Sequence, residues 1–371
     1  MTETSSRQTT LTLVIPCYNK EQTLERCVER VLAIADDRLV LELIIVDDAS
    51  RDDSVSVAQK LIQHHPNIRL FRHERNQGKG AALRTGFAQA TGDFVGVQDA
   101  DLEYDPQDLR KLIVPLTEGR ADVVFGSRFL YSGERRVMYF WHSQMNRALT
   151  FLSNKFSDLG LTDMVTCYKL FRREIIQSIQ IEEHRFGFEP EIVAKVAEMR
   201  CRVYEAPISY HERTYAEGKK LNWKDGLRAL YCILHYGANR APLPMQIMVY
   251  LFIGGTAALF NLLVFLFLFS TLSVGPSAII AYYAAAGLNY WLCIHLLFKK
   301  NIRWKTGIEQ LIYFVAVTGI ALVDMALTTA FLAFGIGPAG AKLLASCIVV
   351  MLNFVTRRFL VFPESRSEDW R

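Results

Sequence analysis

The sequence predicts an α/β domain with a parallel sheet and helices on both faces, followed by an all-α domain of four transmembrane helices. Over residues 11–126, short apolar runs rich in β-branched residues alternate with amphipathic stretches, which is typical of a parallel sheet with crossover helices. Residues 241–294 contain no Lys, Arg, Asp or Glu. Because one crossing takes about 20 apolar residues, this stretch has room for two membrane helices.

The composition supports two dissimilar parts. The chain has 371 residues, of which 51% are hydrophobic and 22% charged, with a net charge of +4. Such values exclude disordered, collagen-like and disulfide-scaffold proteins. Residues 1–240 hold 33 basic and 33 acidic residues, whereas residues 241–371 hold nine basic and five acidic ones. Because no basic arm or face accompanies the excess, no nucleic-acid partner is expected.

The cysteines and the N-terminus indicate the compartment. The seven cysteines show no Cys-x-x-Cys pair, so we expect small apolar side chains in a reducing compartment. The first ten residues are polar and lack the apolar core of a secretory signal peptide. The α/β domain is therefore predicted to be cytoplasmic.

The α/β domain can be divided into elements in chain order. The predicted strands are residues 11–16, 41–47, 68–72, 94–98 and 123–126, and the predicted helices are residues 23–35, 53–64, 80–90 and 106–118. In such sheets ligands bind beyond the carboxyl ends of the strands. The polar residues that stand out in this sequence fall at those ends.

The ends of the first two strands argue for a nucleoside rather than a dinucleotide. No glycine-rich Gly-x-Gly-x-x-Gly loop follows the first strand, which argues against a nicotinamide or flavin enzyme. The second strand ends in Asp47-Asp48, which suits ribose hydroxyls or a base edge. Taken alone, the pair fits a helix N-cap with a solvated neighbour equally well.

The fourth strand ends in a cluster of carboxylates, Gln98-Asp99-Ala100-Asp101-Leu102-Glu103. Strand alternation would place Asp99, Asp101 and Glu103 on one side, where they repel one another unless a cation lies between them. Mg²⁺ and Mn²⁺ accept carboxylate ligands and keep open positions for substrate phosphates. The sequence therefore predicts a divalent-metal site here, although turns are also rich in Asp.

Basic and polar residues elsewhere are candidate phosphate contacts. Gly78-Lys79-Gly80 begins a helix, and Arg128 follows the fifth strand. His142, Asn146 and Arg147 share a face of a later helix. The alternative for each is an ordinary loop, cap or solvated face.

The C-terminal part is predicted to cross the membrane four times, near residues 245–270, 277–298, 308–334 and 339–361. Basic residues lie in the loop 299–305 and at Arg357-Arg358, so both ends of this domain are expected on the cytoplasmic side. Each Asn of the pairs Asn289-Tyr290 and Asn353-Phe354 precedes a Phe by nine residues, which suggests two duplicated hairpins.

The polar residues inside these spans have two explanations. For Asn261, Asn289 and Asn353 we favour hydrogen bonds between helices. Asp324 fits such a bond and a path for a polar lipid headgroup equally well, because membrane carboxylates are costly. Before the first span, residues 219–240 combine basic residues with an apolar face formed by Leu227, Leu230, Tyr231 and Leu234. They predict an interfacial helix, with packing on the α/β domain as the alternative.

Seven ordered motifs resemble the family 2 glycosyltransferases, in particular the dolichol-phosphate mannose synthase and polyprenyl-phosphate glycosyltransferase branch. The motifs are Val14–Glu21, Val46–Ser50, Asn76–Gly80, Asp99–Glu103, Gly126–Arg128, Asp163–Arg172 and Arg213–Lys220. The C-terminal part is similar to the GtrA-like family by its four spans and by one motif at Asn353–Phe362. Domain limits of 1–212, 213–240 and 241–371 follow for the catalytic, juxtamembrane and membrane parts.

The resemblance implies a GT-A, Rossmann-like fold that binds a nucleotide-sugar, and it assigns roles to residues. Asp99, Asp101 and Glu103 would hold Mg²⁺ or Mn²⁺ on the diphosphate, and Asp101, Arg128 and Arg213 are the expected catalytic residues. The nucleotide-sugar would contact Pro16, Tyr18, Glu21, Asp48, Lys79 and Asp99. The acceptor phosphate would contact Arg128, His142, Asn146, Arg213 and Lys219. Where some members carry an Arg, this chain has His142.

The implied reaction is an inverting transfer of mannose or glucose, from GDP-mannose or UDP-glucose, to a polyprenyl or dolichyl phosphate at the cytoplasmic membrane face. A lipid phosphate is already anionic, so no general base is needed. The alternative is a flippase or scaffold for lipid-linked sugars in which the enzyme domain is secondary. A processive polysaccharide synthase is rejected because Lys300 stands where its Gln-x-x-Arg-Trp motif needs Gln. The sequence leaves the sugar, the metal and any homo-oligomer open.

Overall fold

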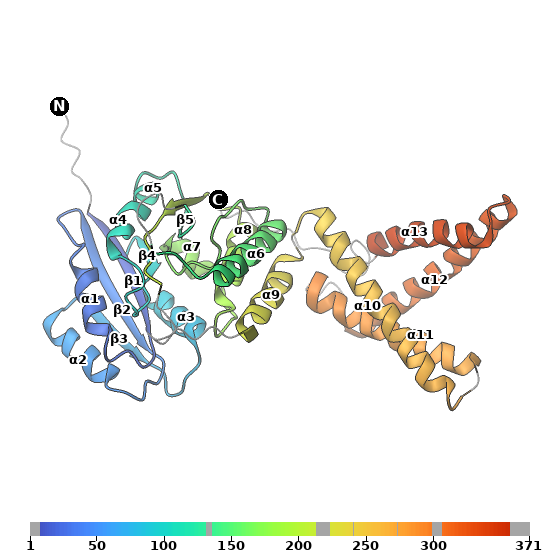
Figure 1. Ribbon diagram of the computed structural model, residues 1–371, viewed down its shortest axis with the longest axis horizontal. Coiled ribbons are helices and arrows are strands. Elements are labelled where there is room, and N and C mark those ends of the chain that lie inside the picture. Colours follow the sequence, from blue (N-terminus) through green and yellow to red (C-terminus); the bar gives the residue numbers. More distant parts are fainter. Residues whose placement is uncertain are drawn as a thin grey trace. The chain divides into compact units, whose positions relative to one another are not determined.

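The computed structural model describes residues 8–130, 136–212, 223–239, 241–272, 274–298 and 306–356. The chain divides into two compact units, with the boundary between Gly237 and Ala238 (Figure 1). The first unit is an α/β domain and the second is helical, which confirms the predicted fold class.

A seven-stranded sheet forms the centre of the first unit, in the order β3-β2-β1-β4-β6-β5-β7. Its strands are β1 (Thr9–Cys17), β2 (Leu39–Asp47), β3 (Ile68–Arg72), β4 (Phe94–Val97), β5 (Val123–Ser127), β6 (Lys169–Arg172) and β7 (Val203–Pro207). The five predicted strands are confirmed. Strand order reverses between β1 and β4, the place where such sheets bind ligands.

The expectation of a purely parallel sheet is wrong, because β6 runs antiparallel to both β4 and β5. Strand β6 begins with Lys169, which is fully buried. A lysine at the start of so short an apolar stretch is typical of a surface loop. The sequence pattern therefore did not predict this strand.

Helices cover both faces of the sheet, as predicted. Leu11, Leu13 and Ile15 of β1 share a core with apolar side chains of α1 (Leu24–Leu32) and α2 (Ser54–His64). The alternate residue Val14 faces α3 (Lys79–Gln89), where a Cβ on Gly86 would lie 2.2 Å from a Val14 methyl carbon. Figure 1 shows α1 and α2 on one side of these strands and α3 on the other.

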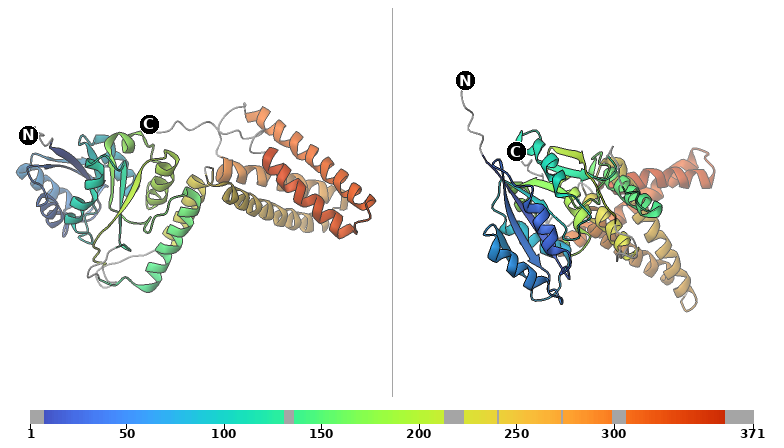
Figure 2. Two further views of the ribbon diagram at one scale, coloured as in Figure 1. Left: turned by 90° about the horizontal axis from the view of Figure 1, so that it is seen from above. Right: turned by 60° about the vertical axis from the view of Figure 1, so that its left-hand side comes forward.

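The helix expected over residues 106–118 is broken into η1 (Pro106–Asp108), α4 (Leu109–Leu112) and α5 (Val114–Thr117). Pro115 has no N–H to continue the helical hydrogen bonds. The later helices are α6 (Phe140–Ser157), α7 (Arg173–Ser178), α8 (Phe188–Glu198) and α9 (Trp223–Gly237). Helices α6, α8 and α9 pack against one another (Figure 2).

Helix α9 belongs to the first unit, and its two faces differ. Cys232, Ile233 and Tyr236 are buried, and Arg228 and Tyr236 both hydrogen bond to Glu183. Leu227, Leu230 and Tyr231 are exposed. One face thus packs on the α/β domain, while most of the apolar face predicted to meet a membrane stays uncovered.

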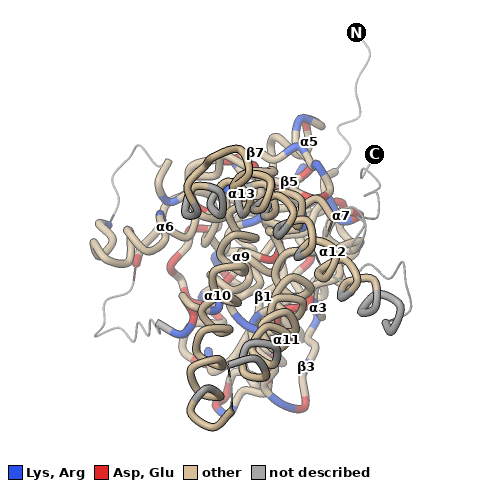
Figure 3. The backbone as a smooth tube through the Cα atoms, turned by 90° about the vertical axis from the view of Figure 1, so that its right-hand side faces the viewer, with Lys and Arg blue, Asp and Glu red and all other residues tan. Residues whose placement is uncertain are grey.

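The second unit contains α10 (Leu243–Phe269), α11 (Val274–Leu292), the π-helical turn η2 (Cys293–Phe298), α12 (Thr306–Ala333) and α13 (Pro338–Thr356). These helices lie where the four spans were predicted. Helices α10 and α11 contain no charged residue, and α11 is tan wherever it is described in Figure 3. Among the described residues, Leu243–Leu268 and Ile280–Leu297 are long and apolar enough to cross a membrane.

Membrane crossing by α12 and α13 stays a prediction. The side chain of Asp324 and the basic loop 299–305 lie outside the described residues.

Candidate active site at the carboxyl edge of the sheet

Asp48, just beyond β2, holds the loop that leads into α3. Its carboxylate accepts hydrogen bonds from the backbone N–H groups of Gln77 (2.8 Å) and Gly78 (2.7 Å), and it pairs with Nδ1 of His73 at 2.7 Å. Asp48 is only 3% exposed. The structure therefore gives this carboxylate a positioning role in the loop, and direct contact with a nucleoside stays a prediction.

Gly78 has to be glycine for two reasons. Its φ of +97° lies in the region that side chains disfavour. A Cβ there would also lie 2.4 Å from the carbonyl oxygen of His184. Asp48 and the 183–184 backbone thus fix the start of α3 and with it the position of Lys79.

Lys79 lies in a row of alternating charges that runs from the half-buried Lys79 and Asp99 to the buried Glu189 and Lys169. Its Nζ is 3.0 Å from Asp99 and 3.6 Å from Glu189, and Glu189 is also paired with the fully buried Lys169. Burial by itself would lower the pKa of the Lys79 ammonium, but Asp99, Cys167 and Glu189 together outweigh burial and raise the pKa. Conversely, Lys79 holds the pKa of Asp99 below its usual value against the effect of burial.

The three predicted metal carboxylates do not lie on one side of a strand. Strand β4 ends at Val97, and Leu102 adopts a left-handed φ of +64°, so the alternation does not continue to Glu103. Glu103 is buried and accepts a hydrogen bond from Tyr210 Oη at 3.1 Å. No group of three His, Cys, Asp or Glu side chains in the described part of the chain is arranged to hold a metal.

A divalent cation still fits a smaller donor set. Asp101 is partly exposed, and its Oδ1 accepts a long hydrogen bond from the N–H of Glu103 at 3.3 Å. Mg²⁺ is commonly bound by one or two carboxylates together with substrate phosphates. Of the three predicted metal ligands, Asp101 is therefore the one that best fits a cation. Asp99 lies close to it in sequence but is paired with Lys79.

The residues after β1 form the outer wall of this edge. Pro16 pairs with Val46 in the sheet. The ring of Tyr18 is 40% exposed, and Glu21 accepts a hydrogen bond from the N–H of Asp53 at 3.0 Å. An exposed aromatic ring at the strand-order reversal is suited to stack on a nucleoside base.

Arg128 is buried and held by Asp163, a residue to which sequence reasoning gave no role of its own. Two nitrogens of the guanidinium lie 2.7 and 2.8 Å from the two Asp163 oxygens, and the guanidinium also lies over the Tyr210 ring at 5.1 Å. Burial alone would lower the pKa of Arg128, but the Asp163 carboxylate, together with the neighbouring Tyr104 and Tyr210, outweighs burial and raises the pKa. With 5% exposure, Arg128 is a fixed charge below the surface of the site.

His142 and Asn146 on α6 lie together, as predicted, and a third residue positions them. Nδ1 of His142 is hydrogen bonded to Glu212, and Nε2 lies 3.3 Å from the Asn146 amide nitrogen. Glu212 also accepts the N–H of Tyr139 at 3.0 Å and is 2% exposed. With Nδ1–H donated to Glu212, Nε2 of the neutral ring accepts from the Asn146 amide, and protonation of the ring turns Nε2 into a donor suited to an anion.

The remaining predicted residues, Arg213 and Lys219, lie outside the described residues. The sequence analysis missed Asp163, Glu189 and Glu212 as site residues. Glu189 carried a signal, because an acidic residue within the apolar pattern of α8 implies a buried partner. No local pattern indicated that Asp163 pairs with Arg128 or Glu212 with His142, because these partners lie 35 and 70 residues apart in the sequence.

Both units are similar to known proteins. Residues 12–180 match the family described as "Glycosyl transferase family 2", and residues 249–362 match "GtrA/DPMS, transmembrane domain". The dolichol-phosphate mannosyltransferase of Pyrococcus furiosus is 26% identical over 356 residues, which cover 94% of this chain and 96% of that protein. The dodecaprenyl-phosphate galacturonate synthase of Rhizobium johnstonii is 28% identical, over 56% of this chain and 61% of its own.

Among solved structures, glucosyl-3-phosphoglycerate synthase of Mycobacterium tuberculosis, in complex with Mn²⁺, UDP and glucosyl-3-phosphoglycerate, is similar with a TM-score of 0.48 and 21% identity. The match covers 62% of this chain and 80% of that one. The two family matches show that the chain carries a family 2 glycosyltransferase domain, on the α/β sheet, and a GtrA/DPMS transmembrane domain, on the helical unit.

Proposed function

We propose that the protein transfers a hexose from a nucleotide-sugar to a polyprenyl or dolichyl phosphate, with inversion at the anomeric carbon. One observation carries the proposal. A sheet edge with the partly exposed Asp101 and Lys79 and the buried Arg128 is joined in one chain to a membrane-type domain. A relative named for transfer to dolichol phosphate matches this chain over nearly its whole length.

The reaction breaks the bond between the anomeric carbon and the nucleoside diphosphate and forms a bond from that carbon to an oxygen of the lipid phosphate. Because the acceptor is already anionic, no general base is needed, and catalysis depends on alignment and on neutralising charge. In-line attack on an α-linked donor gives a β-linked product. When bound, Mg²⁺ or Mn²⁺ supplies positive charge to the leaving diphosphate.

Individual residues are assigned separate roles in binding the substrates and neutralising their charge. Tyr18 stacks on the nucleoside, and Asp101 is the cation ligand. Arg128, fixed by Asp163, places a positive charge beneath the reacting groups. His142 and Asn146, supported by Glu212, contact the acceptor phosphate, and Arg213 and Lys219 are proposed to complete that site. The proposed location of this site is the cytoplasmic face of the membrane.

Transfer can be tested with the full chain reconstituted in liposomes that contain a polyprenyl phosphate. With radiolabelled GDP-mannose and UDP-glucose tested in parallel, we expect one donor to give lipid-soluble label that requires both the lipid phosphate and a divalent cation. The product should be the β anomer by NMR. Absence of lipid-soluble label with either donor, from protein that is monodisperse, would contradict the proposal, and an α-linked product would contradict inversion.

The supporting role of Glu212 predicts a specific kinetic change. Glu212→Gln keeps an oxygen that can accept the Nδ1–H of His142 but removes the charge that stabilises a positive imidazole. We expect the KM for the lipid phosphate to rise about tenfold, since one charge-assisted contact contributes roughly 1.5–3 kcal/mol. The KM for the nucleotide-sugar should stay the same.

The matched comparison is Glu212→Asp, which keeps the charge and should recover part of the acceptor affinity. If Glu212→Gln instead raises both KM values equally, Glu212 has only a general structural role.

A further inference from the structure

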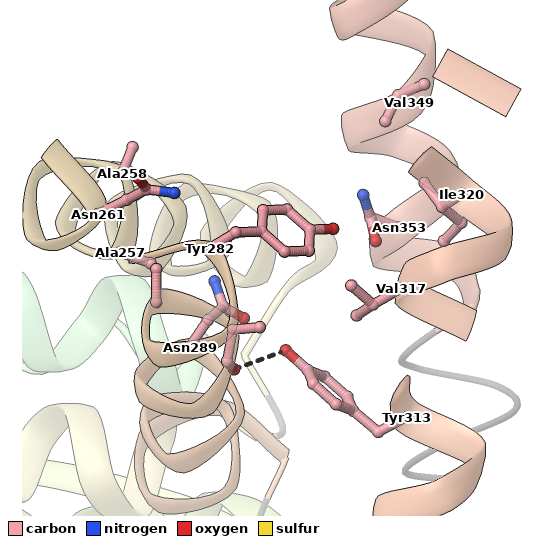
Figure 4. Close-up of a pocket in the computed structure, with 12 residues that line it drawn as sticks. Ala257, Ala258, Asn261, Tyr282, Asn289, Tyr313, Val317, Ile320, Val349 and Asn353 are labelled. Atoms are coloured by element: carbon pink, nitrogen blue, oxygen red, sulfur yellow. Dashed lines mark hydrogen bonds between the residues drawn. The ribbon is translucent and has the colours of Figure 1, made fainter. Parts of the chain in front are cut away.

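The helical unit contains a pocket whose chemistry differs from that of the charges around Lys79 in the first unit. The pocket has a volume of about 300 Å³ and lies among α10, α11, α12 and α13, with a mainly apolar lining (Figure 4). Asn289, one of its amides, already accepts a hydrogen bond from Cys293 Sγ at 3.5 Å. At the sheet edge of the first unit, by contrast, the groups nearest to Lys79 are full charges.

These charges form a single connected set, here called the charge row, which consists of Lys79, Asp99, Glu189 and Lys169. Lys79 Nζ lies 3.0 Å from Asp99 and 3.6 Å from Glu189, and Glu189 pairs in turn with Lys169. Two ammonium groups and two carboxylates give the row a formal charge of zero. The side chains of Lys79 and Asp99 are 15% and 16% exposed, whereas those of Glu189 and Lys169 are 7% and 0% exposed. A substrate therefore meets Lys79 and Asp99 directly, and it senses Glu189 through Lys79.

The sheet topology places the charge row between the two strand ends that carry Asp101 and Arg128. Strand β6 lies between β4 and β5 in the sheet. Because β6 runs antiparallel to both, its first residue, Lys169, lies at the edge where β4 and β5 end, and it pairs with Phe125 of β5. Asp101 follows β4 and Arg128 follows β5. The start of β6 is thus the part of the edge between these two residues.

In-line attack requires the hexose to lie between the leaving diphosphate and the attacking phosphate. With the cation on Asp101 and the reacting groups above Arg128, the hexose ring would lie along the start of β6. Cys167, which is half-buried there, has its Sγ 3.0 Å from Lys79 Nζ. The ring would therefore meet a surface that includes Cys167, Lys79 and Asp99.

The charges at this surface favour a neutral sugar. Hydroxyl groups of a hexose can donate to Asp99 and accept from Lys79. A hexuronate has a carboxylate in place of the C6 hydroxymethyl group. That carboxylate would approach Lys79, which two carboxylates already share, in half-buried surroundings where repulsion between like charges is only weakly screened.

We propose that Glu189 makes the site selective for a neutral hexose over a hexuronate, because it balances the charge of Lys79. This inference rests on the proposed function, since it takes the nucleotide-sugar to bind at this edge. Glu189 acts through Lys79 and does not touch the sugar. The preference between the two kinds of donor then follows the net charge of the charge row, which single substitutions shift in opposite directions.

The test measures the affinity of the full chain, in phosphatidylcholine nanodiscs with Mn²⁺, for two donors that differ only at C6. The donors are UDP-glucose and UDP-glucuronate, or GDP-mannose and GDP-mannuronate if the transfer assay shows a preference for GDP-mannose. Isothermal titration calorimetry gives each Kd. We expect the wild type to bind the hexose donor at least about tenfold more tightly, the order of one charge-assisted contact. Equal binding, or tighter binding of the uronate donor, would overturn the proposal without any variant.

Two single variants change the charge in opposite directions. Glu189→Gln gives the row a net charge of +1, and Lys169 keeps its bond to the Thr166 carbonyl and its place over the Phe125 ring at 5.5 Å. We expect the Kd of the uronate donor to fall about tenfold, whereas the Kd of the hexose donor should not fall. Lys169→Met gives the row a net charge of −1 and should widen the preference for the hexose.

The double variant Glu189→Gln/Lys169→Met returns the row to zero and should restore the wild-type preference. The matched surface control is Glu182→Gln, because Glu182 is 50% exposed and pairs with Lys195 at 2.8 Å. We expect this control to bind both donors like the wild type.

Three results from the variants would overturn the role of Glu189. Equal weakening of both donors by folded Glu189→Gln would leave it only a structural role, and a gain in uronate affinity that persists in the double variant would make size the cause. If Glu189→Gln does not fold, Lys169→Met decides, and an unchanged ratio of the two Kd values would contradict the proposal. Failure of the proposed function would appear elsewhere, because the wild type would then make no lipid-linked sugar in the transfer assay, whichever donor it prefers.

Discussion

Replacing Asp101 with asparagine is expected to lower sugar transfer about a thousandfold while the protein stays folded. The variant keeps an oxygen that can accept the N–H of Glu103, which lies 3.3 Å away in the wild type, but it loses the negative charge that a divalent cation requires. Loss of one preorganised electrostatic contact at a reacting centre typically costs about 10²–10³ in rate. The measurement is initial transfer rate in the liposome assay, over a range of Mn²⁺ and Mg²⁺ concentrations.

The matched control for Asp101 is Asp105→Asn. Asp105 lies four residues further along, where it accepts the N–H of Gln107 at 3.1 Å and pairs with Arg30 at the surface. Its replacement should leave transfer within about twofold, since exposed pairs contribute about 0–1 kcal/mol. Transfer by Asp101→Asn within a few fold of the wild type would refute the role of Asp101 as cation ligand.

Replacing Asp163 with asparagine should strongly destabilise the first unit. Asp163 is fully buried, and its carboxylate is the partner of the buried Arg128 guanidinium. Removing one member of a buried ion pair leaves an uncompensated charge and costs about 3–5 kcal/mol. For a unit of this size that corresponds to a fall in Tm of roughly 10 °C, measurable by thermal unfolding followed by circular dichroism.

The double variant Asp163→Leu/Arg128→Met removes both charges and should recover part of the lost stability, because two apolar side chains often replace a buried pair at little cost. Glu118→Gln, at the exposed Glu118–Arg120 pair, is the surface comparison and should change the free energy of unfolding by less than about 1 kcal/mol. Equal stability of Asp163→Asn and the wild type would contradict the importance of this pair.

The parts of the fold that were predicted correctly are those with a local signal. Strands β1 to β5 and helices α1 to α3 carry uninterrupted apolar or amphipathic patterns, and the structure places them within a few residues of the predicted limits. Strand β6 was missed because Lys169, which begins it, is buried only by virtue of Glu189, twenty residues further along. A sequence pattern treats such a lysine as solvated.

The candidate site likewise has residues that a local sequence signal predicted and residues that it did not. The sequence placed Asp99, Asp101 and Lys79 at the sheet edge correctly, because strand ends set that edge. It could not foresee that Leu102 turns to a positive φ and sends Glu103 toward Tyr210. It also could not foresee Glu212 or Asp163, because only the tertiary fold brings them to His142 and Arg128.

The segment around Glu183 has a practical consequence for shortening the protein. Its carboxylate accepts hydrogen bonds from Arg228 and Tyr236 of α9, and its carbonyl oxygen would lie 2.3 Å from a Cβ placed on Gly80, next to Lys79. A water-soluble version ended at residue 212 would remove both donors and uncover the Glu183 carboxylate directly behind the loop that positions Lys79. The smallest intact catalytic fragment therefore ends after Gly237, and α9 has to be kept with the sheet rather than with the membrane helices.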